Sequence, residues 1–273
     1  MAKMADFAIS PDGTRIAHET GGSGAPLILV HGASGDRTST PALRASLEET
    51  HAVTRYDRRG RGESEDTGAY DFLAEADDLR AVIAVAADRP VVFGLSMGAR
   101  IALELLRNPP DLAAMVLWEP PATDRVDPEF ADGLSRVRDA METDGAEAAT
   151  ALHSRLFHRR SSQDIEELKR DETRWKARVG HMPVTLREME AVHRDCLFVP
   201  RNYKRPEFGV HQIAGDGTLP FLQASSKLVG SVGFVQSHVL PGQDHSAPSK
   251  NPSSVLKAFL DAVPPDRALD GRW

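Results

Sequence analysis

Apolar residues follow two different spacings along the first part of the chain. Residues 26–30 form an uninterrupted apolar run, which is typical of a strand buried on both faces of a parallel sheet. Residues 72–87 instead place Leu79, Val82 and Ile83 on one side of a helix, and this spacing predicts an amphipathic helix. Because such strands and helices alternate, we expect an α/β fold in which helices cover both faces of a mostly parallel sheet.

The same patterns predict the other elements. Two short strands, at 6–9 and 14–18, flank the turn signal Pro11-Asp12-Gly13 and should form a β-hairpin. The other expected strands are the apolar run before Gly94 and residues 26–30, 52–56, 113–118, 210–214 and 234–240. The other expected helices are the segment between Gly98 and Pro109 and residues 41–49, 129–141, 147–157, 163–176 and 253–262.

The strand pattern is absent from residues 122–206, where charge-rich helical segments take its place. An interruption of this length is long enough to fold as a lid rather than as a loop. We therefore expect an α/β core made of residues 1–121 and 207–273, with a helical lid inserted at 122–206. Most apolar residues of the lid should pack it onto the core, and some should roof a pocket for a small to medium apolar substrate. The candidates are Leu152, Leu156, Phe157, Trp175, Met182, Val184, Leu186, Met189, Leu197 and Phe198.

Composition narrows the class of protein. A net charge of −7 over 273 residues argues against a nucleic-acid partner, which requires a basic face. The only cysteine, Cys196, cannot form a disulfide within the chain and fits a reducing compartment. The first residues lack an apolar signal core and no run is long enough to cross a membrane, so we expect a cytoplasmic monomer or homodimer without a membrane partner.

A candidate nucleophile lies in the segment Gly94-Leu95-Ser96-Met97-Gly98, between a predicted strand and a predicted helix. A serine in such a turn has its hydroxyl pushed out at the carboxyl edge of the sheet, and the flanking glycines allow the tight turn. The N-terminal amides of the new helix point toward negative charge that develops beside the hydroxyl. This arrangement suits nucleophilic attack on a carbonyl.

In the order of its motifs, the chain resembles the α/β-hydrolase family over nearly its whole length. The motifs are a strand ending in His31-Gly32, the loop Tyr56-Asp57-Arg58-Arg59-Gly60-Arg61-Gly62-Glu63-Ser64, the turn at Ser96, a helical insertion after the next strand, and a late His245. The resemblance implies an α/β-hydrolase fold, a structural role for His31, and oxyanion donors at the amides of Ala33 and Met97. We interpret Asp57 and Arg58 as a brace between loops rather than as catalytic groups.

A serine hydroxyl needs a base, and we assign that role to His245, which follows the last strand on a loop at the carboxyl edge of the sheet. His153, His158, His181 and His193 lie in the insertion and are interpreted as surface or lid residues. A carboxylate must orient the histidine, and two candidates remain open. The family usually has an Asp where this chain has Thr218, with Asp216 nearby, whereas Glu119 ends the strand after the serine helix. We favour Glu119.

Serine at the turn predicts acyl transfer, since the family's epoxide hydrolases and dehalogenases use a carboxylate nucleophile there. Hydrolysis of a carboxylic ester, or of a lactone or thioester, is the leading hypothesis, with a small molecule as the partner and no cofactor. The alternatives are a biosynthetic cyclase or acyltransferase, a carbon–carbon hydrolase on the same serine and histidine, and a catalytically silent binding protein.

Overall fold

A single eight-stranded sheet runs through the molecule. The computed structural model describes residues 5–67, 70–195 and 197–263, and the predicted role of Cys196 therefore concerns a residue outside the described chain. The strands are β1 (Asp6–Ile9), β2 (Arg15–Gly21), β3 (Ala25–Val30), β4 (His51–Tyr56), β5 (Val91–Leu95), β6 (Ala114–Trp118), β7 (Gly209–Gly215) and β8 (Val235–Leu240).

The strand order is β1-β2-β4-β3-β5-β6-β7-β8. From β4 to β8 every neighbouring pair is parallel, while β1 and β2 form the predicted antiparallel hairpin and β2 pairs antiparallel with β4. The hairpin turns at Gly13, whose φ of 88° favours glycine. The mostly parallel sheet expected from the apolar runs is confirmed.

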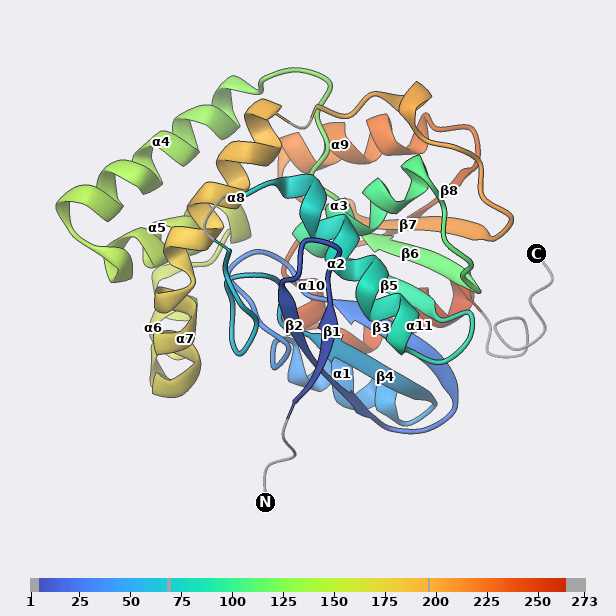
Figure 1. The fold of residues 1–273 in the computed structure, drawn as a ribbon. Helices are drawn as coiled ribbons and strands as arrows, with labels where there is room; N and C mark the ends of the chain where they lie inside the picture. Colours follow the sequence, from blue (N-terminus) through green and yellow to red (C-terminus); the bar gives the residue numbers. More distant parts are fainter. Residues whose placement is uncertain (1–4, 68–69, 196, 264–273) are drawn as a thin grey trace.

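Core helices cover both faces of this sheet, as Figure 1 shows. They are α1 (Pro41–Glu48), α2 (Phe72–Val85), α3 (Met97–Glu104), α9 (Pro220–Gly230), α10 (Ala247–Lys250) and α11 (Pro252–Ala262). Leu79 of α2 and Ile101 of α3 are buried in one apolar cluster. Leu43 of α1 and Phe259 of α11 are buried in a second cluster, where the ring of Phe259 stacks on Phe93 of β5 at 4.9 Å between centroids.

Between β6 and β7, the described part of the chain forms five further α-helices, which gather at one side of the molecule (Figure 1). They are α4 (Pro128–Thr143), α5 (Ala146–His158), α6 (Ser162–Arg170), α7 (Glu172–Gly180) and α8 (Met182–Asp195). They join the core through an aromatic cluster, in which Phe130 of α4 meets Phe157 of α5 and Phe221 of α9 with centroids 5.0 Å and 5.5 Å apart. The inserted helices therefore share an apolar core with the sheet domain.

Helices α6 to α10 differ from the sequence-based prediction. The single helix expected at 163–176 is wrong, because Asp171 leaves the helical region with ψ 82° and accepts a hydrogen bond from Arg174 N, so that it ends α6 and begins α7. Helices α8, α9 and α10 were not predicted. The spacing of Met182, Leu186 and Met189, all buried, is the signal that identifies α8.

Strand register places two of the predicted site residues at one edge of the sheet. Leu95 of β5 pairs with Trp118 of β6, and Trp118 pairs with Ile213 of β7. The next residues, Ser96 and Glu119, therefore leave the sheet side by side at its carboxyl edge, where ligands of parallel α/β sheets bind. Among residues 5–67, 70–195 and 197–263, no helix is both long enough and apolar enough to cross a membrane.

Candidate active site

Ser96 connects β5 to α3 through a strained backbone conformation, with φ 52° and ψ −115°. Its amide donates to the Trp118 carbonyl at 2.8 Å, which ties the turn to the neighbouring strand. Close packing on both sides requires glycine. A Cβ at Gly94 would lie 2.5 Å from Ala99 Cα, and a Cβ at Gly98 would lie 2.3 Å from the Val30 carbonyl oxygen. The strand–turn–helix predicted around Ser96 is thus confirmed in its geometry.

Ser96, His245 and Glu119 form a continuous chain of contacts. Ser96 Oγ lies 2.9 Å from His245 Nε2, and His245 Nδ1 lies 2.6 Å from Glu119 Oε2. A carboxylate only accepts hydrogen bonds, so Nδ1 carries a proton and donates it to Glu119. In the neutral imidazole Nε2 is then the acceptor for the Ser96 hydroxyl.

Glu119 is fully buried and its two carboxylate oxygens are held from three sides. Besides His245, the amide of Gly215 donates to Oε1 at 2.8 Å, and the hydroxyl of Thr218 donates to Oε2 at 2.9 Å. Thr218 stands where the family usually has its Asp. Sequence reasoning noted this departure but missed its consequence, which is that the hydroxyl at this position binds the carboxylate supplied by β6.

Asp216, the alternative acid, does not contact His245 in this structure. Its side chain is exposed and accepts a hydrogen bond from the amide of Gly242 at 2.7 Å, which joins the loop after β7 to the loop before His245. The hypothesis that Asp216 orients His245 is therefore corrected. The physical reason is that Gly215 and Thr218 turn inward to Glu119, which leaves Asp216 on the outside of the same loop.

The loop that contains Ala33 lies against Ser96. A Cβ added at Gly32 would lie 3.3 Å from Ser96 Cβ, so the two segments nearly touch. The amides of Ala33 and Met97 both adjoin this contact, and in the described chain neither amide donates to a protein acceptor. Two N–H groups are thus free next to the serine hydroxyl, and the first amides of a helix are commonly free in this way.

A cavity of about 440 Å³ opens over Ser96 and His245, within the usual size range of small-molecule sites. The core supplies the loop of Ala33, and the inserted helices supply Leu168, Trp175 and Arg178. Of the apolar lid residues from which a roof was expected, Trp175 is the only one among the described residues that line this cavity. Most of the other cavity residues from the inserted helices are charged or polar, which differs from the apolar roof that we expected.

A family model described as the alpha/beta hydrolase family matches residues 27–258. The chain belongs to the alpha/beta hydrolase family. A 113-residue segment is also 34% identical to the uncharacterized hydrolase YraK of Bacillus subtilis (strain 168), covering 40% of this chain and 42% of YraK. The match therefore spans less than half the length of that curated relative.

Solved structures of other proteins resemble this chain over nearly its whole length. An alpha/beta hydrolase from Sphaerobacter thermophilus DSM 20745 is 24% identical, with a TM-score of 0.76, covering 94% of this chain and 99% of that protein. The esterase RhEst1 from Rhodococcus sp. ECU1013 is 18% identical, with a TM-score of 0.73, covering 95% and 98%. At these identities the similarity concerns the fold alone.

Several histidines of this α/β hydrolase are more buried than their sequence context indicated. His153 and His181, interpreted as surface or lid residues, are 1% and 9% exposed. The ring of His158 packs edge-on against that of His245, with centroids 5.9 Å apart, and also meets His153 at 5.1 Å. Burial is the main cause that lowers the pKa of His153 to about 3 and the pKa of His158 well below its ordinary value. Both rings are therefore neutral near pH 7.

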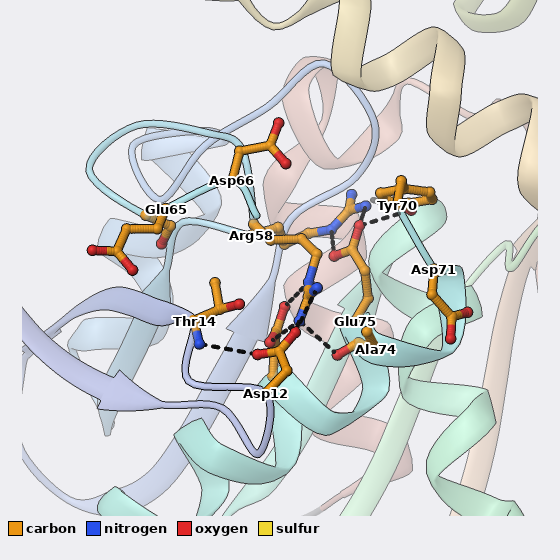
Figure 2. A network of polar contacts seen from close by, with 12 residues as sticks. Asp12, Thr14, Arg58, Glu65, Asp66, Tyr70, Asp71, Ala74 and Glu75 are labelled. Carbon is orange, nitrogen blue, oxygen red and sulfur yellow. Dashed lines mark hydrogen bonds and ion pairs between the residues drawn. The ribbon is translucent and has the colours of Figure 1, made fainter. Parts of the chain in front are cut away.

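The loop of Asp57 and Arg58 braces the core, as interpreted from the sequence. Figure 2 shows Arg58 beside Glu75 and Tyr70, where the guanidinium donates two hydrogen bonds to the Glu75 carboxylate at 2.9 Å and 2.8 Å. The same guanidinium pairs with Glu188 of α8. Arg58 therefore links the core to an inserted helix and does not line the cavity above Ser96.

No group of three or more His, Cys, Asp or Glu side chains in the described parts of the chain could hold a metal ion.

The contacts of His31 are those of a structural residue. Its Nε2 accepts from the amide of Arg58 at 3.3 Å, and its Nδ1 lies 2.8 Å from the Gly32 carbonyl oxygen. These contacts hold the loop that carries Ala33.

Proposed function

We propose that this α/β hydrolase cleaves carboxylic esters through an acyl-enzyme formed on Ser96. The observation that carries the proposal is the chain of contacts from Ser96 to His245 to Glu119 within one cavity of small-molecule size. A nucleophile, a base within hydrogen-bond distance of it and a carboxylate that orients the base are the three parts that acyl transfer needs. The esterase RhEst1, with the same fold, gives the proposal further support.

In the first step the Ser96 hydroxyl oxygen attacks the ester carbonyl carbon while His245 Nε2 takes its proton. Glu119 stabilises the imidazolium that forms, because its carboxylate is buried against Nδ1. The carbon–oxygen bond to the alcohol then breaks, and Nε2 returns the proton to the leaving oxygen. Water, deprotonated by the same nitrogen, adds to the acyl group and releases the carboxylic acid and Ser96.

Negative charge develops on the carbonyl oxygen during both additions. The free amides of Ala33 and Met97 next to Ser96 are proposed to bind this oxygen. Donors aimed in advance at developing charge lower the barrier without reorganisation, and one such donor typically contributes about 10²–10³ in rate. Both donors belong to the backbone, so a side-chain substitution does not remove them.

The identity of the nucleophile favours acyl transfer over the family's other chemistry. Epoxide hydrolases and dehalogenases with this fold attack carbon through a carboxylate and form an ester with the enzyme. In this chain the residue at the turn is Ser96, whose attack on an alkyl carbon would form an ether that water does not readily cleave. Attack on a carbonyl instead gives an acyl ester that hydrolysis can release.

The test is hydrolysis of p-nitrophenyl esters, from acetyl to octanoyl, by the wild-type protein and by Ser96→Ala. We expect turnover that is greatest at one acyl length, because a cavity of about 440 Å³ limits the acyl group that it can hold. We also expect a loss of about 10⁴-fold or more in Ser96→Ala. Ser253→Ala, a substitution of an exposed serine on α11, is the matched control and should keep wild-type turnover. A fluorophosphonate should label the wild-type protein on Ser96. Failure to label Ser96, or equal hydrolysis by Ser96→Ala, would contradict the proposal.

A further inference from the structure

Two arginines without carboxylate partners line the cavity that contains Ser96 and His245. Arg160 follows the C-terminal end of α5, and Arg178 lies on α7. Within the described residues, neither guanidinium makes a hydrogen bond or an ion pair, and Arg160 Nε is buried without a partner. Because unpaired charge is costly to remove from water, such groups call for an explanation.

The backbone at the end of α5 turns Arg160 toward this cavity. Arg159 adopts the left-handed conformation, with φ 50°, and its guanidinium donates to the Gly217 carbonyl oxygen at 3.3 Å on the outside of the molecule. The amide of Arg160 donates to the Ser154 carbonyl oxygen at 3.2 Å. Both arginines border the hollow beside Gly217, but of the two only Arg160 also lines the cavity with Ser96.

The carboxylates around these arginines are already engaged with other groups. Each accepts a hydrogen bond or forms an ion pair elsewhere: Asp36 with Thr38 Oγ1 at 2.6 Å, Asp164 with Lys250 at 3.2 Å, Glu167 with Gln163 at 3.2 Å, Asp171 with Arg174 at 3.2 Å, and Asp244 with Ser246 Oγ at 2.6 Å. None of these carboxylates forms an ion pair with Arg160 or Arg178, so the two guanidinium groups keep their hydrogen-bond donors available to a ligand.

The electrostatics of the cavity show positive charge that its carboxylates compensate only in part, because burial lowers the pKa of Arg160 although the charges of Asp164 and Asp244 raise it. Burial and then the charge of Arg160 lower the pKa of Arg178 to about 10, and Asp36 offsets only part of this effect. The same two arginines contribute to the lowered pKa of His158, whose ring packs on His245. A bound anion would relieve this repulsion, and it would also favour the imidazolium that His245 forms during the reaction.

We propose that Arg160 and Arg178 bind a carboxylate carried by the substrate, so that the ester cleaved on Ser96 is a half-ester of a dicarboxylic acid. A planar guanidinium matches a carboxylate with two parallel hydrogen bonds. A cavity of about 440 Å³ has room for a short acyl chain between the ester group and the free carboxylate of such a substrate. The ester chemistry rests on the proposed function, whereas the carboxylate subsite is testable without turnover.

Binding is measured by calorimetry on Ser96→Ala, with monomethyl glutarate and dimethyl glutarate as probes that differ only in the free carboxylate. We expect the half-ester to bind at least about tenfold more tightly than the diester, because charge-paired contacts are lost in the diester. Arg178→Gln in the same background should reduce this difference to less than about threefold. If circular dichroism shows that Arg178→Gln does not fold, Arg160→Gln serves as a second, independent variant.

Arg174→Gln is the matched control, since Arg174 borders the same cavity but is exposed and pairs with Asp171 at 3.2 Å. It should preserve the preference for the half-ester. Equal binding of the two probes to Ser96→Ala, or no binding of either probe, would overturn the proposed subsite. A similar loss of preference in Arg174→Gln would overturn the assignment to Arg160 and Arg178, because any cavity cation would then suffice.

Kinetics separate this inference from the proposed function. We compare the wild-type protein with Arg178→Gln, in which Ser96 is intact. The ratio of kcat/KM for the half-ester to kcat/KM for the diester should be about 10–100-fold lower in Arg178→Gln than in the wild-type protein. Hydrolysis of both esters at equal kcat/KM would leave ester hydrolysis standing and exclude the subsite. Selective binding of the half-ester without hydrolysis of any ester would support the subsite and exclude ester hydrolysis on Ser96.

Discussion

Glu119 leaves β6 with a positive φ of 42° and reaches His245 across the sheet edge. The extra methylene of Glu compared with Asp lets the carboxylate extend from this strand to the imidazole. Gly215 and Thr218, from the loop after β7, hold it from the other side. Two loops therefore share one buried carboxylate, and the family's usual acid position supplies a hydroxyl donor in this chain.

At this scale we predict unequal effects of removing the two candidate acids. Glu119→Gln should lower kcat by about 10⁴-fold, because the amide keeps the volume of the side chain but no longer stabilises the imidazolium. Asp216→Asn should lower kcat by less than about threefold, since Asp216 contacts Gly242 and not His245. Both variants are compared in a p-nitrophenyl ester assay at neutral pH. The opposite ranking would show that His245 takes its acid from the loop after β7.

Helix α8 is tied to the core by buried charges. Glu188 has a fully buried side chain and pairs with both Arg58 and Arg61 of the loop after β4. Arg58 in turn pairs with Glu75 of α2 (Figure 2). One inserted helix, one loop and one core helix therefore share a single ionic network.

Breaking this network should destabilise the protein. Glu188→Gln leaves Arg61 and part of Arg58 without a compensating charge, and we expect a loss of about 3 kcal/mol in the free energy of unfolding, since removing one partner of a buried pair costs about 3–5 kcal/mol. Urea unfolding followed by circular dichroism measures the loss.

Glu190→Gln provides the comparison, because the same chemical change is made two residues away on the same helix. Glu190 pairs with Arg138 at 3.4 Å near the surface, where a pair contributes about 1 kcal/mol or less. Equal losses in the two variants would mean that the buried network adds nothing to the attachment of α8.

At the scale of the whole molecule, buried neutral histidines link stability to pH. Burial lowers the pKa of His153 to about 3, and burial together with the neighbouring His238 lowers the pKa of His211 to about 4. In the unfolded chain both rings take up protons near pH 6.5. Below that pH protons bind the unfolded state preferentially, so the stability present above pH 6.5 is lost as pH falls toward the folded-state values.

We predict that the free energy of unfolding decreases between about pH 7 and pH 5, with each such histidine contributing up to about 1.4 kcal/mol per pH unit. Urea titrations at several pH values measure the slope. His153→Gln and His211→Gln should each flatten it, whatever their effect on stability at neutral pH. A slope that neither substitution changes would assign the pH dependence to other groups.

Local sequence determined those features that depend on short-range spacing. The uninterrupted apolar runs predicted the strands of the parallel sheet, and the glycines around Ser96 predicted the sharp turn, because only glycine avoids the clashes with Ala99 and Val30. His245 was assigned as the base from its loop after the last strand together with the family resemblance. Such patterns are readable because strand and helix periodicities are properties of consecutive residues.

Tertiary structure decided what depends on residues far apart in the chain. Glu119 and Asp216 both lie near His245 in the predicted topology, and the inward turn of Gly215 and Thr218 is what separates them. The charged cavity wall was equally unpredictable, because it forms only when α5 and α7 fold back over Ser96. A sequence pattern reports which face of an element is apolar, whereas the partners of a buried charge are set by which elements pack together in space.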